Sequence, residues 1–342
     1  MGVQKGSLMT NTKPRRFFKI SLALVAILLV TGFTLRTPDT DFDAMHDKYG
    51  GALAKYSQGT RIATDNTVMN IHYRDQGNPN GEPIVFIHGS SASLHTWEDL
   101  IANMSKGAEN RYRFISLDLP GHGLTGPHPK DDYSADGMMQ GVDMLLDTLN
   151  IDSVSLVGNS MGGWISWRYA LANPERVKAL ILVDAAGAPT TEHPPLNLGF
   201  RLMRNPITRP LTKIFTPRSI IKTSIEQTVY DPSRVDDKTT DLYWELLRYP
   251  GNRRATSIRA LIDREDAYGK RLSEIQIPTL ILWGEEDQLI YVASAHTFHE
   301  ALPNSQLITY PNIGHIPMEE TPEEMAKDVL IFLGEALKKE AP

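Results

Sequence analysis

Short apolar runs alternate with segments of helical spacing along most of this chain. Strands that are apolar on both faces and alternate with helices are typical of a mostly parallel sheet with helices on both sides. The pattern therefore predicts an α/β fold. The predicted strands are residues 84–88, 113–118, 153–157, 177–184, 278–284 and 305–310, and the predicted helices are residues 93–105, 133–149, 161–172 and 321–338.

The alternation fails in one long stretch, residues 187–263. Proline recurs there, apolar and aromatic residues are scattered, and no strong strand pattern is present. Ligands of open α/β sheets bind at the carboxyl ends of the strands, and the stretch begins at such an end, after Asp184. We therefore expect a helical cap over the active site, inserted after the sixth strand.

The remaining segments complete the expected domain organisation. Residues 60–75 predict two strands joined by the turn signal Asp65–Asn66. Residues 37–58 are expected to be a tether with a short helical stretch. The core of the fold is expected in residues 59–186 and 264–342.

The N-terminus has a charge pattern of its own. Residues 1–36 hold six basic residues and no acidic one, and Ile20–Leu35 is a run of sixteen uncharged residues. A basic flank before an apolar run is typical of a secretory signal or a signal anchor. No Ala-x-Ala cleavage site follows, which favours an uncleaved membrane anchor. We expect the catalytic domain on the periplasmic side of the membrane, or secreted if the segment is cleaved.

Charge and cysteine content exclude several classes of protein. The chain has 35 basic and 41 acidic residues, so residues 37–342 keep 29 basic and 41 acidic residues, a net charge of −12. A body that acidic is a poor nucleic-acid binder, because phosphate binding needs a basic surface. The absence of cysteine excludes disulfides and thiolate catalysis. No cofactor or metal is expected, and the composition leaves the oligomeric state open.

Ser160 is the candidate nucleophile. It lies in Gly158-Asn159-Ser160-Met161-Gly162, between a predicted buried strand and a predicted helix. The pattern Gly-x-Ser-x-Gly forms a tight strand-to-helix turn that exposes the serine hydroxyl.

A serine nucleophile needs a base, and the base needs an orienting acid. His315 is the expected base, because it follows Gly314 in the loop after the last strand. Asp287 is the expected acid, with Asp184 as its main rival and Glu285 and Glu286 as further candidates. The order serine, aspartate, histidine is that of α/β-hydrolases.

Two backbone N–H groups are expected to stabilise the oxyanion of the reaction. One belongs to Met161, which opens the helix after the nucleophile, and the other to Ser90 in the loop after residues 84–88. His88 is expected to hold that loop by hydrogen bonds. The turn Asp118-Leu119-Pro120-Gly121-His122-Gly123 is expected to be structural, with His122 packed at its edge.

These motifs together resemble the α/β-hydrolase superfamily across residues 60–338. Within it, the stretches His88–Trp97 and Gly121–Pro127 resemble membrane-anchored or secreted bacterial lipases and esterases of the cold-adapted type. The Asn159-Ser160-Met161 turn is also similar to that of carbon–carbon hydrolases acting on ring-cleavage products. The oxyanion loop of those enzymes is usually richer in glycine than Gly89-Ser90-Ser91-Ala92.

The resemblance implies a serine carboxylesterase or lipase that acts on a small-molecule ester or lipid through an acyl-enzyme. Two alternatives remain on the same scaffold: carbon–carbon bond hydrolysis or perhydrolysis, and a non-catalytic binding module.

Overall fold

The computed structural model describes residues 36–51, 54–56, 60–62, 67–108, 110–189, 194–262 and 267–338. The predicted N-terminal anchor lies outside these residues. Among the residues that are described, no helix combines the length and the apolar character needed to cross a bilayer.

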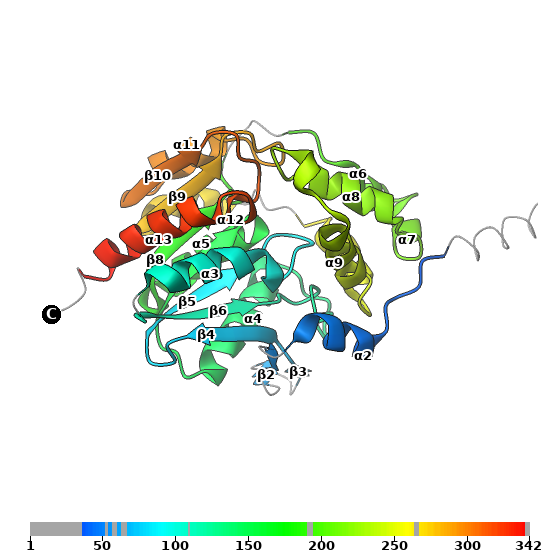
Figure 1. The fold of residues 1–342 in the computed structure, drawn as a ribbon, viewed down its shortest axis with the longest axis horizontal. Helices are drawn as coiled ribbons and strands as arrows, with labels where there is room; N and C mark the ends of the chain where they lie inside the picture. The colour runs from blue at the N-terminus through cyan, green and yellow to red at the C-terminus, as the bar shows by residue number, and fades with distance from the viewer. Residues whose placement is uncertain are drawn as a thin grey trace, which may run out of the picture.

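An eight-stranded sheet forms the centre of the molecule (Figure 1). Its strand order is β1-β4-β6-β5-β7-β8-β9-β10. The six strands from β6 to β10 in this order run parallel, whereas β4 and β1 are antiparallel additions at one edge. The strands are β1 (Ala54–Tyr56), β4 (His72–Gly77), β5 (Glu82–Ile87), β6 (Tyr112–Leu117), β7 (Val154–Asn159), β8 (Val177–Val183), β9 (Thr279–Gly284) and β10 (Ser305–Tyr310).

Alternate side chains of the central strands enter two separate hydrophobic cores. In β5, Val85 and Ile87 pack into one core, and Ile84 and Phe86 pack into the other. Both faces must therefore be covered by helices. Helices α3 and α13 pack together on one face, and α4, α5 and α11 cover the other (Figure 1). Their bounds are α3 (Glu98–Gly107), α4 (Ala135–Thr148), α5 (Met161–Ala172), α11 (Ala293–Ala301) and α13 (Pro322–Ala336), with α12 (Pro317–Glu320) before the last.

The expected insertion after β8, the sixth strand of this sheet in chain order, consists of helices and one 3-10 turn in its described part. It stands beside one end of the sheet (Figure 1). Its elements are α6 (Leu198–Arg204), α7 (Arg209–Thr212), α8 (Arg218–Glu226), η4 (Pro232–Arg234), α9 (Asp237–Leu247) and α10 (Asn252–Arg259), and η5 (Ala267–Glu274) leads back to β9.

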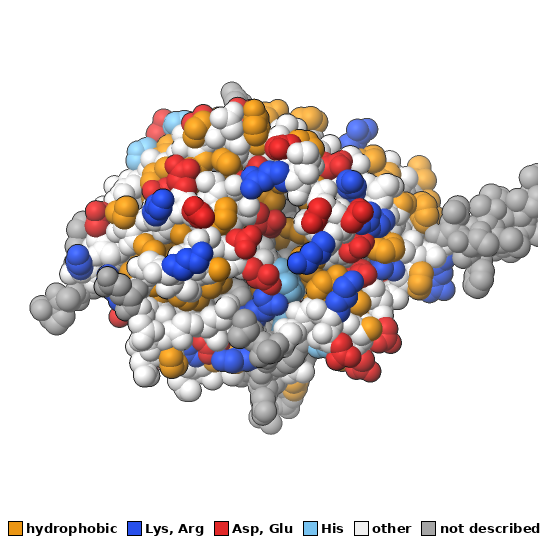
Figure 2. Space-filling view, in the orientation of Figure 1, with side chains coloured by type: hydrophobic (Ala, Val, Ile, Leu, Met, Phe, Trp, Pro, Cys, Tyr) orange, Lys and Arg blue, Asp and Glu red, His pale blue; other side chains and the backbone are white. Residues whose placement is uncertain are grey.

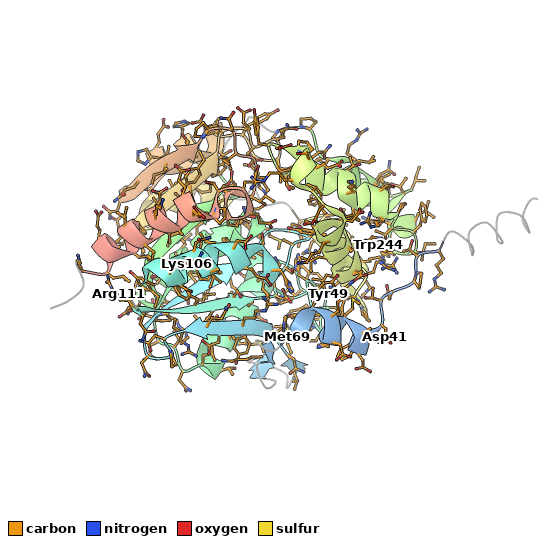
Figure 3. All side chains as sticks on the ribbon, in the orientation of Figure 1. Asp41, Tyr49, Met69, Lys106, Arg111 and Trp244 are labelled. Atoms are coloured by element: carbon orange, nitrogen blue, oxygen red, sulfur yellow. The ribbon has the colours of Figure 1, made fainter. Side chains whose placement is uncertain are left out.

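The segment predicted as a tether is bonded to the cap. It contains α2 (Phe42–Met45) and a π-helical turn, η1 (His46–Gly50). Thr40 donates its backbone N–H to Arg248 O at 3.0 Å, and the Tyr49 hydroxyl donates to Glu245 at 2.7 Å. Figure 3 shows Tyr49 on the side of η1 that faces α9. These contacts attach residues 37–50 to α9 instead of leaving them extended.

Two predicted elements differ in detail from the structure. Residues 60–75 form the short pair β2 (Thr60–Ile62) and β3 (Thr67–Met69), and then β4, which joins the main sheet. The helix predicted at residues 93–105 begins with a 3-10 turn, η2 (Leu94–Trp97). The first residue of this turn donates its backbone N–H to the carboxylate of Asp118 at 2.8 Å, which holds the turn against the loop after β6.

Candidate active site

The predicted nucleophile lies in the sharp turn between β7 and α5. Ser160 has φ 53° and ψ −117°, a left-handed conformation that costs about 1–3 kcal/mol for a residue other than glycine. The surroundings impose it: Ser160 donates its N–H to Val183 O at 3.0 Å and accepts from Ala186 N at 2.9 Å. A Cβ on Gly162 would lie far inside contact distance of the Ile87 carbonyl oxygen. The glycine is therefore required by the close approach of α5 to β5.

His315 and Asp287 are brought together from two loops at the carboxyl ends of the neighbouring strands β9 and β10. The ring Nδ1 of His315 lies 2.7 Å from Asp287 Oδ2, and both side chains are buried. Asp287 Oδ1 accepts the backbone N–H groups of Leu289 and Ile290 at 2.7 and 3.0 Å. His315 and Ser160 line one cavity of about 960 Å³, a volume that includes the space open to solvent.

Asp184, the rival acid, lies behind this pair. Its Oδ1 accepts the backbone N–H of Gly284 at 3.0 Å. One ligand-type atom from each of Asp184, Asp287 and His315 lies within 4.8 Å of the other two. Burial, followed by the charge of Asp287, raises the pKa of Asp184 well above its usual range. Two carboxyl groups this close oppose each other's ionisation, so the raised pKa makes Asp184 the member of the pair that favours the protonated form, and Asp287 faces the histidine.

The oxyanion loop runs directly against the nucleophile. A Cβ on Gly89 would lie 3.1 Å from Ser160 Cβ, and both Gly89 and Ser90 line the cavity. Met161 begins α5, where the positive end of the helix dipole points toward developing negative charge. The oxyanion roles of Ser90 and Met161 stay predictions.

His88 holds its loop through both ring nitrogens, as expected. Its Nδ1 donates to Gly89 O at 2.7 Å, and its Nε2 accepts the Leu119 N–H at 3.0 Å. Burial lowers the pKa of His88 to about 4, so the ring is neutral at physiological pH. His122 packs its ring edge-on against His88, with centroids 4.8 Å apart.

The turn that follows β6 is structural. The Asp118 carboxylate accepts from Leu94 N at 2.8 Å, from Leu124 N at 2.8 Å and from His72 Nδ1 at 2.6 Å. Although burial opposes ionisation, the His72 hydrogen bond holds the pKa of Asp118 well below its usual range. The buried carboxylate therefore links the loops that contain Leu94 and Leu124 to His72, the first residue of β4.

Sequence reasoning missed two residues that fasten the histidine loop. Asn159 donates its side-chain amide to His315 O at 3.0 Å and to Val183 O at 3.2 Å. Glu320 accepts the N–H of Gly314 and the N–H of Tyr230, each at 2.8 Å. Asn159 could have been recognised from the sequence, because it is adjacent to the nucleophile. Glu320 could not, because its partner in the cap, Tyr230, is 90 positions away in the chain.

Two arginines of the cap region line the same cavity and were also missed. Arg204 lies at the end of α6, where its Nε donates to Ala260 O at 2.9 Å. Arg259, at the end of α10, donates from NH1 to Gly121 O at 2.9 Å and from NH2 to Thr256 Oγ1 at 2.8 Å. The cavity therefore combines a serine nucleophile with cationic groups.

Comparison with known proteins defines the class first. Residues 82–322 match the alpha/beta hydrolase fold family, and the chain belongs to that family. It is a hydrolase, as the sequence motifs predicted.

The relatives then narrow the chemistry. A 2-hydroxy-6-oxononadienedioate/2-hydroxy-6-oxononatrienedioate hydrolase from Burkholderia vietnamiensis is 29% identical over 82% of this chain and 96% of its own length. A meta-cleavage product hydrolase structure from Pseudomonas fluorescens IP01 is 26% identical, with a TM-score of 0.68, and the match covers 82% of this chain and 99% of that one. Lipase 3 of a Moraxella species is 29% identical over 78% of this chain and 82% of its own length.

These comparisons correct the expected activity. The expectation of a carboxylesterase or lipase is wrong, because the nearly full-length matches to hydrolases of ring-cleavage products favour the carbon–carbon alternative. The physical reason for the error is that ester and carbon–carbon hydrolysis need the same serine, base and acid. The oxyanion loop, on which the ester assignment depended, does not separate them.

Proposed function

We propose that this chain hydrolyses a carbon–carbon bond beside a ketone in a conjugated 2-hydroxy-6-oxo acid. The substrate class is the one that the relatives named above act on, and such molecules carry at least one carboxylate. The site supports the proposal because it places a nucleophile, a base and cations around one cavity.

The cationic lining is the observation that carries this proposal. Arg204 and Arg259 line the cavity that holds Ser160 and His315. Arginine binds carboxylates with paired N–H groups in a fixed plane. An uncharged acyl chain offers these cations no partner, whereas a dienoate or dienedioate brings a carboxylate that they can bind.

The substrate first takes its 2-keto form, in which the proton of the 2-hydroxyl has moved to C5. Ser160 Oγ adds to the ketone carbon C6 while His315 takes its proton, and the N–H groups of Ser90 and Met161 stabilise the oxyanion. The bond from C6 to C5 then breaks. Its electron pair passes into the conjugated fragment, which receives the proton from His315.

The acyl group is left as an ester of Ser160. Water, deprotonated by His315, hydrolyses this ester and regenerates the serine. Asp287 keeps the imidazole in the required tautomer throughout and stabilises the imidazolium.

The test is turnover of 2-hydroxy-6-oxo-6-phenylhexa-2,4-dienoate by the full-length protein, followed through the loss of the conjugated chromophore. We expect turnover by the parent chain, and Ser160→Ala should lose at least about 10⁴-fold in kcat while its thermal unfolding stays unchanged. Hydrolysis of p-nitrophenyl esters with no loss of the dienoate would overturn the proposal.

We further propose that residues 1–36 hold the enzyme at a membrane with its catalytic domain on the periplasmic side. Five basic residues followed by a run of sixteen uncharged ones support this. Membrane fractionation with protease digestion of intact spheroplasts tests it. Digestion of the catalytic domain is expected, and recovery of the protein in the cytoplasmic fraction would contradict it.

A further inference from the structure

One edge of the cap exposes an unusual number of large hydrophobic side chains. Twelve such side chains are exposed among the described residues, and six of them lie within residues 196–215. Ile207 is the most exposed, at 81%. Isolated apolar residues are normal on soluble surfaces, whereas gathered ones mark an interaction site. The six, here called the cap edge, are Leu196, Leu198, Ile207, Leu211, Ile214 and Phe215.

The same stretch is basic in an otherwise acidic body. Residues 196–215 contain four basic residues and no acidic residue. Figure 2 shows basic and hydrophobic side chains together along the side of the molecule where α7 lies. Apolar side chains next to lysine and arginine are the composition that binds the interface of anionic lipid bilayers. The basic residues are Arg201, Arg204, Arg209 and Lys213.

The N-terminal chain is fastened to this edge. Thr37 donates its N–H to Ile214 O at 2.9 Å, and its carbonyl accepts from Arg253 at 2.7 Å. Its hydroxyl accepts the Thr216 N–H at 3.2 Å. The uncharged run of the proposed anchor ends two residues before Thr37 in the sequence. The cap edge is thus bonded to the first described residues that follow the proposed anchor.

Phe215 of the cap edge belongs to a series of neighbouring cavities that begins at the nucleophile. The cavity of Ser160 shares the lining side chains Phe200 and Tyr243 with a second cavity. The second shares Met203 and Leu247 with a third, which Phe215 also lines. The cap edge is therefore in contact with the walls of the catalytic cavity.

We propose that the cap edge rests on the surface of an anionic lipid bilayer, with its apolar side chains among the acyl chains and Arg201, Arg209 and Lys213 at the headgroups, while Arg204 lines the catalytic cavity. The proposal rests on the membrane anchoring by residues 1–36 proposed above, and it is independent of the proposed carbon–carbon hydrolysis.

The absence of cysteine makes a direct test possible. The full-length chain with Ile207→Cys is labelled with a nitroxide and bound to vesicles of phosphatidylcholine and phosphatidylglycerol. Ile331→Cys is the matched control, since Ile331 is 62% exposed and lies on α13. Collisions of each label with oxygen, which dissolves in lipid, and with a water-soluble nickel chelate are then measured.

On binding, the label at 207 is expected to gain oxygen collisions and lose nickel collisions severalfold, while the label at 331 stays unchanged. Arg209→Glu combined with Lys213→Glu should reduce the change at 207. Equal behaviour of the two labels on vesicle-bound protein would overturn the proposal. So would dipolar broadening between labels at 207 without vesicles, which would identify a second copy of the chain as the occupant.

Discussion

The central sheet and the cap use their side chains in opposite ways. Every residue of β7 and β9 is buried, whereas α6 and α7 contain no buried residue at all. Buried strands leave little freedom, so the sheet holds the triad in one geometry. The cap makes fewer packing contacts, and its surface composition is free to suit a ligand or a surface. The difference indicates that the core sets the reaction and the cap sets what reaches it.

Replacing one glycine by alanine in each region should give the largest difference in stability between the two regions. Gly162→Ala drives its Cβ into the Ile87 carbonyl and is expected to cost about 3 kcal/mol or more. Gly199→Ala in α6 meets only atoms at 3.5 Å and should stay within about 1 kcal/mol of the parent. Urea unfolding measures both, and equal losses would contradict the contrast.

Loss of a hydrogen bond between the core and the cap should have the next largest effect on stability. Glu320→Gln replaces one acceptor oxygen by an NH₂ group and leaves the N–H of Gly314 or Tyr230 unpaired, at a cost of about 1–3 kcal/mol. Because Gly314 precedes His315, kcat should fall together with the midpoint of unfolding. Glu323→Gln, an exposed change on α13, is the control and should leave both unaltered.

Substitution of the cap arginine that lines the cavity should weaken substrate binding and leave the chemical step unchanged. Arg204→Gln is expected to raise KM for a dienoate about 10–100-fold, as for a lost hydrogen bond to a charge, with kcat nearly unchanged. Arg201→Gln on the same helix does not line the cavity and should keep the parent KM. A similar increase of KM in both variants would instead indicate a general charge effect.

The last prediction concerns the pH dependence of stability and Asp184, whose effect is small near pH 4 and grows with pH. Its folded pKa is raised, so above about pH 4 the folded state keeps a proton that the unfolded chain loses. The parent therefore loses up to about 1.4 kcal/mol of stability per pH unit from pH 4 until the folded pKa is reached. Asp184→Asn abolishes this slope, so its stability relative to the parent should rise with pH.

Chemical unfolding of Asp184→Asn at several pH values checks this. The exposed Asp152→Asn is the control and should show the parent's pH dependence. A variant whose stability difference does not change with pH would show that Asp184 ionises normally.

The sequence predicted the core of this fold closely, because buried strands and elbow glycines have strong local patterns. The helix expected at 161–172 and the strand expected at 305–310 have those bounds in the structure. The attachment of residues 37–50 to α9 had no such pattern, since it depends on contacts between segments about 200 residues apart.

The residues of the candidate site also fall into those that the sequence predicts and those that it does not. Ser160, Asp287 and His315 were each recognisable beside a strand end, and the structure brings the histidine and the aspartate within 2.7 Å. Glu320, Arg204 and Arg259 were not recognisable, because an isolated glutamate or arginine carries no local signal of what it will face.

By itself, the sequence determined the α/β architecture and singled out the candidate nucleophile with its candidate base and acid, because these depend on short motifs and on the period of apolar residues. Only the tertiary structure decided which carboxyl group faces His315 and which one is buried behind it with a raised pKa. It also placed two arginines in the cavity and gathered the exposed apolar residues into one edge. These properties depend on distances between segments remote in the chain, and periodicity carries no information about such distances.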